Sequence, residues 1–499
     1  MHTLFTLGAL AALSTRYAHA LFETTYKSTS LAIEPFTVLE RSLDYDPDNV
    51  NLFLVCRSPW SLPARSTIYN SNGGLVWSDP SFGPCTDLNL QIFDGQQYLT
   101  MWGGFGLAAN KPQMGTGNGV AVMINFEYQI VKNVSAVNPM GTDLHEFNIV
   151  QPNNTALVTA YNPIPFDLSS IGGLANGWYL NSIMQEVDIA SGRILFNWSS
   201  VDHIALSESY NNISHLSHWY TFRVDVILAR PITARKFPQD LEGNYLVSSR
   251  HCQTIYKIAK NGTILWRLGG KTSDFTAIGD GTEFHWQHHA RWRNDEMQIS
   301  LFDDGAGSIE STVIVDEPVA TGKYLNVDQK TITVSLAKRF DNFSLAEGST
   351  EPYGDTVVVS YGNNPWVTVH DFASISVLFS AIIGPNNASF HGINNYRTFQ
   401  TSTLQFAGHP KQPPAVALSG GDVYVSWNGA THVASYTLLT GHAANDVCTR
   451  VTIVPKASFE TKIHGSGIRA FLKVAALAKN GTTLGTSAVY NATDGSVVL

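Results

Sequence analysis

The sequence predicts an all-β protein, a six-bladed β-propeller followed by a small β-sandwich of the fibronectin-III type. Charged residues make up only 14% of the 499 residues, whereas glycine (40) and proline (21) are frequent. This composition favours many short strands joined by tight turns over long amphipathic helices. No long stretch places apolar residues at helical spacing, and a strand-then-hairpin pattern recurs along the chain.

The recurring hairpin consists of two short strands around a turn that contains Gly or Asn. The clearest copies are residues 68–77, 187–196 and 256–266, and less regular copies cover residues 123–134, 325–336 and 367–379. Asn-Gly and Ser-Gly pairs tolerate the positive φ angles that tight hairpin turns require. Each of these segments is therefore expected to form two neighbouring strands of one sheet.

A short apolar strand is expected before each hairpin, at residues 52–56, 98–102, 156–161, 245–249, 298–302 and 356–361. Six such strands with six hairpins predict six blades around a channel, because radial repetition protects the edges of the sheets. A pair of β-sandwiches is the alternative. It would also contain short strands, but it would not require the strand-then-hairpin order to recur.

Three parts of the chain are expected. Residues 1–20 are typical of a signal peptide, with an apolar run over 4–13 and small residues around a cleavage position at Ala18-His19-Ala20. Residues 21–409 form the predicted propeller. A proline-rich linker begins at 410, and alternating segments after it predict a sandwich over 410–499 with Trp427 in its core.

Two further features indicate export into an oxidising compartment. Cys56 and Cys85 flank one predicted hairpin and are the expected disulfide, whereas Cys252 and Cys448 fall in different predicted domains. Nine glycosylation sequons follow the signal-like segment, at Asn133, Asn153, Asn197, Asn212, Asn261, Asn342, Asn387, Asn480 and Asn491. We therefore expect a glycoprotein that is secreted or retained in the lumen of the secretory pathway.

The net charge argues against one class of partner. The formal charge is −9 and no cluster of Lys and Arg stands out, so nucleic acid is not expected to bind. The apolar run near the N-terminus is too short to cross a bilayer of roughly 30 Å, and no later segment is both long and apolar enough to span one.

Three polar segments lie where strands of different blades begin or end, and they contain the candidate site residues. His145 lies twelve residues before Leu157, and His288 lies eleven before Ile299. The two histidines thus take equivalent places in two blades, while Arg250 ends the fourth short strand. Since ligand sites form where several elements meet in a concavity, these side chains are expected to converge on the channel.

The cluster His285-x-x-His288-His289 also raises the possibility of zinc. Residues 285 and 288 point to opposite faces of a strand because side chains alternate, and no Cys or carboxylate at the right spacing completes a site. No metal or other cofactor is therefore expected. Asp303 and Asp304 precede Gly305 and are expected to shape a turn.

The motifs around these residues resemble the fungal arylsulfotransferase family, relatives of the bacterial arylsulfate sulfotransferases. The resemblance covers about residues 44–414. It rests on segments that occur in a fixed order, among them Asp143-Leu-His-Glu-Phe, Gly243-Asn-Tyr-Leu-Val-Ser-Ser-Arg-His, Trp266-Arg-Leu-Gly-Gly, Trp286-Gln-His and Ile299-Ser-Leu-Phe-Asp-Asp-Gly.

In that family a sulfuryl group passes from a phenolic sulfate to a phenol through a sulfohistidine, without a nucleotide donor. The resemblance implies that His288 is the nucleophile, that Arg250 holds the sulfate oxygens and that His145 assists with charge or a proton. Structural roles are the alternative, with His145 as a strand cap and Arg250 in an ion pair. The neighbouring candidates for substrate binding are His251, His289 and Arg291, although His289 also suits a structural role.

One segment departs from the family pattern. The family usually has a further channel histidine before the fourth strand, but residues 223–238 contain none and are apolar and basic. Two other functions therefore stay open beside the enzyme. One is a non-catalytic propeller that binds phenolic or carbohydrate ligands, and the other is a channel that serves another small-molecule reaction.

Overall fold

The described part of the chain consists mainly of β-strands and connecting loops. The computed structural model describes residues 23–57, 65–106, 116–210, 219–221, 243–309, 312–342, 344, 346–385 and 394–498. Within these ranges the only helical segments are three-residue 3₁₀ turns, so the all-β class is confirmed. The signal-like residues 1–20, the altered segment 223–238, Asn212 and Asn387 lie outside them.

Six sheets of three to five strands follow one another between Phe36 and Ser402. The first is built from β30 (Asn395–Ser402), β4 (Asn51–Arg57), β5 (Ser66–Asn70) and β6 (Leu75–Asp79), and the second from β7 (Cys85–Phe93), β8 (Gln96–Gly106), β9 (Gly117–Ile124) and β10 (Ile130–Val134). The third contains β11 (Phe147–Val150), β12 (Thr155–Phe166), β13 (Gly177–Asp188), β14 (Ile194–Ser199) and β15 (Trp219–Thr221).

The other three sheets continue the series. The fourth contains β16 (Tyr245–Ser249), β17 (Thr254–Ile258) and β18 (Ile264–Gly269), and the fifth β20 (His288–Arg293), β21 (Gln298–Asp303), β24 (Ala320–Asp328), β25 (Thr333–Asn342) and β19 (Thr276–Ile278). The sixth contains β26 (Ser349–Tyr353), β27 (Thr356–Ser360), β28 (Trp366–Asp371), β29 (Val377–Ile383) and β3 (Phe36–Arg41). Two-stranded pairs join β1 (Thr24–Thr25) to β2 (Ala32–Ile33) and β22 (Ala306–Ile309) to β23 (Thr312–Val315).

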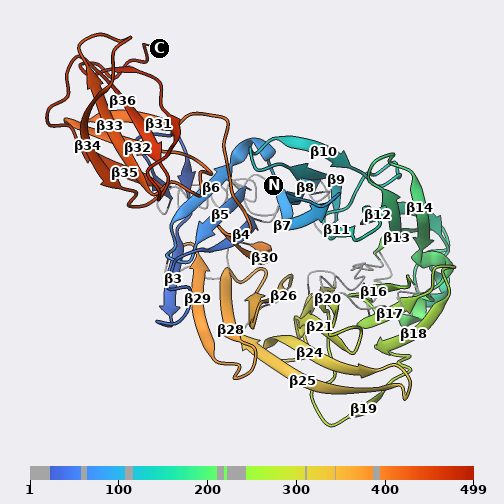
Figure 1. Cartoon of the computed structure of the whole chain (residues 1–499). Coiled ribbons are helices and arrows are strands. Elements are labelled where there is room, and N and C mark those ends of the chain that lie inside the picture. Colours follow the sequence, from blue (N-terminus) through green and yellow to red (C-terminus); the bar gives the residue numbers. More distant parts are fainter. Residues whose placement is uncertain are drawn as a thin grey trace, which may run out of the picture.

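The six sheets are arranged in a ring (Figure 1). The two ends of the ring segment are joined twice by strand pairing. β3, near the N-terminal end, adds to β29 of the sixth sheet, while β30, near the C-terminal end, adds to β4 of the first. Early and late parts of the chain are therefore hydrogen-bonded within the same sheets.

One edge strand of each sheet faces the centre of the ring in Figure 1, namely β7, β11, β16, β20, β26 or β30. Neighbours among these inner strands touch, since β30 contacts β7 and β26, β20 contacts β16 and β26, and β11 contacts β7. Residues at the same end of these strands therefore come close together although they are far apart in the sequence.

The predicted hairpins are confirmed as β5–β6, β9–β10, β13–β14, β17–β18, β24–β25 and β28–β29. The short strands expected before them correspond to β4, β8, β12, β16, β21 and β27. In five sheets a further strand that was not predicted, β30, β7, β11, β20 or β26, lies inside the short strand.

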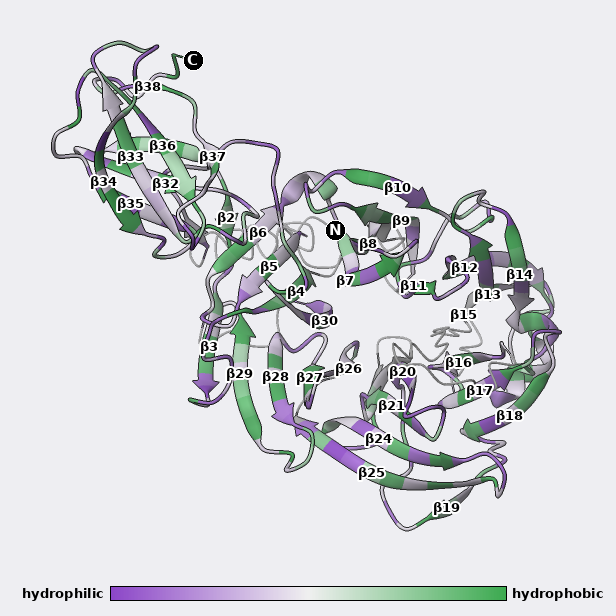
Figure 2. Cartoon of the chain, viewed as in Figure 1, coloured by the Kyte–Doolittle hydropathy of each residue, from purple (hydrophilic) through white to green (hydrophobic). Residues whose placement is uncertain are grey.

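Apolar side chains fill the space between neighbouring sheets. One buried cluster joins Leu246 and Ile255 of the fourth sheet to Ala290 and Leu301 of the fifth. Hydrophobic and hydrophilic residues alternate along β24 and β25 (Figure 2). This alternation is expected where one face of a strand is packed and the other is open.

A separate unit of two sheets stands outside the ring, beside β6 in Figure 1. Its sheets are β31 (Ala415–Ser419), β32 (Asp422–Ser426) and β35 (Glu460–His464), facing β34 (Thr449–Pro455), β33 (Ser435–Gly441), β36 (Phe471–Leu477), β37 (Thr483–Thr486) and β38 (Tyr490–Asn491). Its core includes Val425, Tyr436 and Val474. Trp427 was expected in this core, but it is only partly buried because its indole N–H donates to the Gln412 carbonyl (2.6 Å).

Cys56 and Cys85 form a disulfide with their Cα atoms 5.6 Å apart, and the bond joins β4 of the first sheet to β7 of the second. Cys252 is buried and Cys448 exposed, and both are free thiols. In the described ranges no helix has the length and apolar character needed to cross a membrane.

Candidate functional site

Three inner strands bulge at the same place. In β7, β20 and β30, two residues stand opposite one residue of the next strand: Asp87 and Leu88, His289 and Ala290, Tyr396 and Arg397. A β-bulge bends its strand and redirects the side chains beside it. The bulges therefore aim several polar side chains toward the meeting point of the inner strands.

His145 lies just before β11 and is fixed by a carboxylate from its own loop. Its side chain is only 4% exposed, and its Nδ1 pairs with Asp143 Oδ2. Asp143 is held in turn by backbone N–H groups, since Oδ2 accepts from His145 (3.0 Å) and Oδ1 from Gly117 (2.7 Å). The carboxylate and the imidazole are therefore locked as one unit.

His288 begins β20 and is fixed by a carboxylate from the neighbouring strand. Its side chain is 3% exposed, and Nδ1 lies 2.7 Å from Asp304 Oδ2, just beyond the end of β21. Trp286 and His289 on either side of it have positive φ angles of 58° and 51°. Such left-handed backbone is costly for residues other than glycine, so the surrounding structure holds His288 in a specific orientation.

The aromatic ring of Tyr396 connects the two histidines. Its centroid lies 5.9 Å from the His145 ring and 6.3 Å from the His288 ring, and both contacts are edge-to-face. The Tyr396 hydroxyl also donates to the His145 carbonyl oxygen (3.3 Å). The structure thus brings together the two histidines that the sequence placed in equivalent positions of different sheets.

Arg250 follows β16 and is buried without a carboxylate partner in the described part of the chain. Its side chain is 4% exposed, and its Nε has no hydrogen-bond acceptor. The guanidinium lies over the indole ring of Trp286, 5.3 Å from the centroid. A buried cation that is held by a ring rather than by an anion is suited to bind an anionic ligand.

The segments that carry Arg250 and His288 are bonded to each other. Gln287, directly before His288, donates from Nε2 to Ser248 Oγ (2.9 Å) and to the Ser249 carbonyl (3.2 Å), directly before Arg250. His251 also contacts Trp286, with ring centroids 6.0 Å apart. The segment of Arg250 and His251 is therefore attached to residues 286 and 287, which directly precede His288.

A buried network of four charged residues lies beside Tyr396, and we call it the central ion network. Glu146 accepts from Arg291 Nη2 at 2.8 and 3.0 Å and from Arg397 Nη1 at 3.1 Å, and Arg397 Nη1 also donates to Asp87 (2.8 Å). Burial raises the pKa of Glu146, and the two guanidinium groups oppose that rise. Two positive and two negative charges thus join β7, β20 and β30 to the loop before β11.

His289 and Arg291 point to protein groups in the described structure. Arg291 is bound by Glu146, and His289 accepts the Thr350 N–H at Nδ1 (3.3 Å). Burial, followed by the nearby Arg291, Arg397 and Arg293, lowers the pKa of His289 well below its usual value. Their predicted contact with substrate stays a prediction.

A second charged cluster, which we call the peripheral cluster, contains His285, Asp303, Glu317 and Lys323. Ligand atoms of the first three lie within 4.8 Å of one another, but Lys323 Nζ is already 2.6 Å from Asp303 and 3.7 Å from Glu317. The lysine therefore supplies the positive charge that a metal ion would bring, and the donor set does not fit a metal.

Sequence reasoning missed several residues of this region. Asp304 was expected to shape a turn, yet it holds His288 because the end of β21 lies against the start of β20. Tyr396, Arg397, Glu146 and Asp87 were not singled out. Tyr396-Arg397 in a strand-like segment was the one local indication of this network. An arginine buried in a strand requires acidic partners from elsewhere in the chain.

The glycosylation sequons lie on the surface where the structure describes them. The side chains of Asn133, Asn153, Asn197, Asn261 and Asn480 are exposed, and that of Asn491 is partly exposed.

Comparison with known proteins finds one match in sequence and several weak ones in structure. A family model described as arylsulfotransferase (ASST) matches residues 89–378, which is more than half of the chain. No curated protein matches significantly. Among solved structures, a Bacteroides caccae protein of unknown function has 12% identity and a TM-score of 0.38, covering 70% of this chain and 98% of its own. The periplasmic gluconolactonase PpgL of Pseudomonas aeruginosa has 11% identity and a TM-score of 0.34, covering 70% of this chain and 99% of its own.

Proposed function

Because this chain belongs to the arylsulfotransferase (ASST) family, we propose that it transfers a sulfuryl group from a phenolic sulfate to a phenol, like the fungal members it resembles. The observation that carries the proposal is the pair of buried histidines, His145 and His288. Each holds a carboxylate on Nδ1, and both contact the ring of Tyr396.

In the first step His288 acts as the nucleophile. The Asp304 carboxylate accepts a hydrogen bond from the Nδ1–H of His288, which places the lone pair of the neutral imidazole on Nε2. Nε2 forms a bond to sulfur while the bond from sulfur to the phenolic oxygen breaks, and the phenolate leaves with that electron pair. His145 in its protonated form gives the leaving phenolate a proton, so that a neutral phenol departs.

In the second step the acceptor phenol reverses this chemistry. Neutral His145 removes the proton from the acceptor hydroxyl, and the phenolic oxygen forms a bond to sulfur. The bond between sulfur and Nε2 breaks, and its electrons return to His288. One pocket thus serves donor and acceptor in turn, and the two histidines regain their starting states.

Arg250 is proposed to bind the sulfuryl oxygens. A guanidinium can donate to two oxygens at once, and a buried one stabilises charge that spreads over a group in transit. Among the residues that the structure describes, no carboxylate forms an ion pair with Arg250, which supports this role. Removal of such a donor typically slows a reaction about 10²- to 10³-fold.

The finer architecture and the location of the protein are part of the same proposal. The six sheets are interpreted as the blades of a propeller over residues 21–409, and the terminal unit as a fibronectin-III-like sandwich over 410–499. Secretion through a signal peptide and N-glycosylation are proposed from the sequence. Digestion of secreted protein with an N-glycosidase and measurement of the mass change at the exposed asparagines test the last point.

The enzyme is tested by transfer from 4-nitrophenyl sulfate to phenol. The wild type is expected to turn over repeatedly only when an acceptor is present. Without an acceptor it should release a single equivalent of nitrophenol per enzyme and give a sulfated His288 peptide. His288→Ala should abolish both, whereas His285→Ala in the peripheral cluster should keep them. Undiminished transfer by His288→Ala would refute the assignment of the nucleophile.

A non-catalytic binding protein is the second candidate, and the absence of a histidine in residues 223–238 favours it. Retention of phenols or carbohydrates without any turnover would support this candidate. A trapped sulfohistidine would exclude it.

A further inference from the structure

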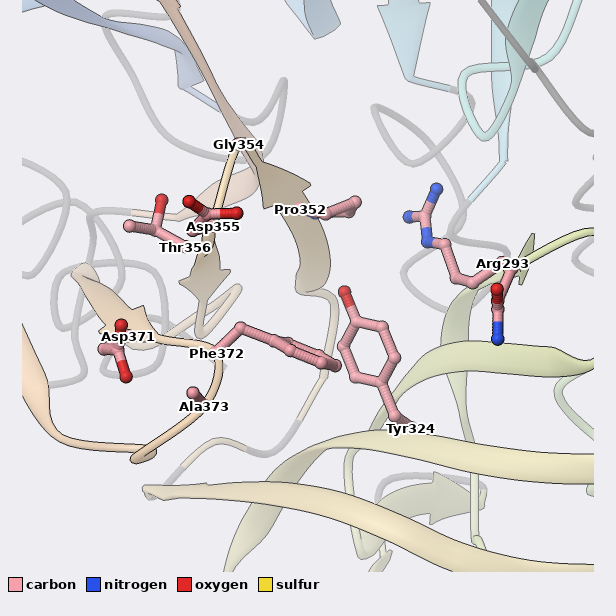
Figure 3. A pocket seen from close by; sticks show the side chains of 10 residues that line it. Arg293, Tyr324, Pro352, Gly354, Asp355, Thr356, Asp371, Phe372 and Ala373 are labelled. Carbon is pink, nitrogen blue, oxygen red and sulfur yellow. The ribbon is translucent and has the colours of Figure 1, made fainter. Parts of the chain in front are cut away.

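A cavity of about 520 Å³ opens between the fifth and sixth sheets, lined by residues of β20, β24, β26 and β28 and of the turns beside them. Figure 3 shows it from close by. Arg293, which lines it, ends β20, while His288 begins that strand. Five residues of extended chain span roughly 15 Å, so the cavity lies at the other end of the sheet from the histidine pair. Its size is typical of small-ligand sites.

Aromatic and proline rings form its apolar part. The rings of Tyr324 and Phe372 meet edge-to-face with their centroids 5.1 Å apart, and Pro352 lies near the Tyr324 hydroxyl in Figure 3. A surface of this kind suits a ligand that has one flat apolar face.

The hydroxyl of Tyr324 lacks a partner. The side chain is 2% exposed, and its oxygen has no hydrogen-bond partner in the described structure. Arg293 lies beside the hydroxyl, but a guanidinium can only donate and this one is bonded to Ser300 Oγ at 2.9 Å and Glu351 Oε2 at 2.5 Å, so the hydroxyl proton has no acceptor. Burial raises the pKa of Tyr324 to about 12, so the hydroxyl is a proton donor at neutral pH. A buried donor of this kind calls for an acceptor from a ligand or from water.

Carboxylates stand at the opposite end of the cavity. The Phe372 N–H donates to the Asp355 carbonyl (3.0 Å), which places Asp355 beside the aromatic rings. Asp371 accepts from the hydroxyl and the backbone N–H of Ser374, and these bonds lower its pKa. Two positive charges lie nearby: Arg293 pairs with Glu351, and Lys338 lies over Phe372 (5.8 Å) and donates to the Ala373 carbonyl (2.7 Å). The cavity thus disfavours anions such as sulfate esters.

We propose that this cavity binds a neutral sugar ring. The C–H face of the sugar lies on Phe372, the Tyr324 hydroxyl donates to a sugar oxygen, and Asp355 and Asp371 accept from sugar hydroxyls. Carboxylates with an aromatic ring beside them match the two faces of a sugar, one rich in hydroxyl groups and one apolar. The site shares no residue with the histidine pair, so this proposal is independent of sulfuryl transfer.

The test is binding of neutral monosaccharides to the full-length protein. Glucose, galactose, mannose and N-acetylglucosamine are titrated and followed by saturation-transfer NMR, with 4-nitrophenyl sulfate and phenol as competitors. The wild type is expected to bind at least one of the sugars without competition from either phenolic compound. Phe372→Ser and Asp355→Asn should each weaken that binding about tenfold or more.

A pair of matched variants separates binding from folding. Tyr324→Phe removes only the unpartnered hydroxyl, whereas Tyr361→Phe removes one that is bonded to Thr368 Oγ1 (3.1 Å). Tyr324→Phe is expected to weaken sugar binding about tenfold with an unchanged Tm and unchanged sulfuryl transfer, and Tyr361→Phe to lower the Tm with unchanged sugar binding.

Three results would overturn the proposal: no neutral sugar binds the wild type, a phenolic compound displaces the bound sugar, or Tyr324→Phe lowers the Tm as much as Tyr361→Phe. None of them bears on sulfuryl transfer, which is assayed separately.

Discussion

The central ion network and the peripheral cluster each contain four charged or titratable side chains, and both lie against the fifth sheet. In the central network the exposed fractions of the ion-paired side chains range from 0% to 12%. In the peripheral cluster Asp303 and Lys323 are equally closed to water (0% and 2%), but His285 and Glu317 are 28% and 26% exposed. The number of charges in a cluster therefore does not determine its effect on stability. The loss of one partner costs more free energy of unfolding where the remaining charge has no access to water.

The largest effect is expected when the central network loses one charge. Among the described residues, Glu146→Gln leaves Asp87, which pairs with Arg397, as the one remaining carboxylate of the network, so it should lower the free energy of unfolding by about 3–5 kcal/mol. Urea unfolding measures this as a lower midpoint with an unchanged slope.

The matched control for that variant is Glu127→Gln. Glu127 pairs with Lys411 at the surface, where the side chains are 44% and 57% exposed, and the expected cost is at most about 1 kcal/mol. Equal costs for the two variants would mean that Glu146 is uncharged in the folded protein.

Asp303→Asn should have the next largest effect. The variant keeps an oxygen that accepts the N–H groups of His285 and Gly305, but it leaves the buried Lys323 ammonium with Glu317 as its nearest anion, 3.7 Å away. The expected loss is about 2 kcal/mol in the same urea experiment. A cost as large as that of Glu146→Gln would show that Glu317 offers no compensation.

His289 lies between His285 and Arg291 in the sequence. It should make the stability of the protein fall at acidic pH. Its folded pKa is lowered by burial, so stability is complete above the unfolded value of about 6.5 and falls as the pH drops below it. Where the unfolded chain binds one more proton than the folded chain, the free energy of unfolding falls by about 1.4 kcal/mol for each unit by which the pH drops. His289→Gln should flatten the stability profile between about pH 6.5 and 5, and an unchanged slope would contradict the shift.

The smallest effect is expected for Glu317→Gln in the exposed part of the peripheral cluster. The Glu317 carboxylate, 3.5 Å from His285 Nδ1, raises the pKa of His285, and the histidine lowers the pKa of Glu317. The pair therefore stabilises most between about pH 4.3 and 6.5, with the contribution lost as pH rises through the folded pKa of His285 or falls through that of Glu317.

In Glu317→Gln, NMR titration should show the pKa of His285 moving down toward its usual value. The change in stability should stay below about 1 kcal/mol because water screens the pair. A pKa of His285 that does not move would assign the shift to Asp303 and Asp316 instead.

Local patterns in the sequence predicted the all-β class and the hairpins, because turn residues and apolar alternation report on neighbouring residues. The same logic located His145 and His288, which stand at similar distances before strands of similar composition. Asp143 was within reach of such reasoning, since it is two residues from His145. Asp304 was not, because only the pairing of β20 with β21 brings it to His288.

The inner strands and the central ion network could not be predicted in this way. Arg397 lies 251 residues from Glu146 and 310 from Asp87, and no local pattern links such positions. The bulges that aim these side chains inward depend on register, which is set only when neighbouring strands pair. The six-bladed interpretation and the roles in catalysis stay proposals for the experiments above.

The double pairing of early and late strands has a consequence for biosynthesis. β3 leaves the ribosome more than three hundred residues before β29, its partner, so it must wait as an unpaired edge while most of the chain is still being made. Protection from premature association then falls to chaperones or to the speed of translation. If translation stalls before residue 377, the ring is incomplete and β3 stays exposed as an unpaired edge strand. Completion of translation is then a condition for protecting this strand from association with other chains.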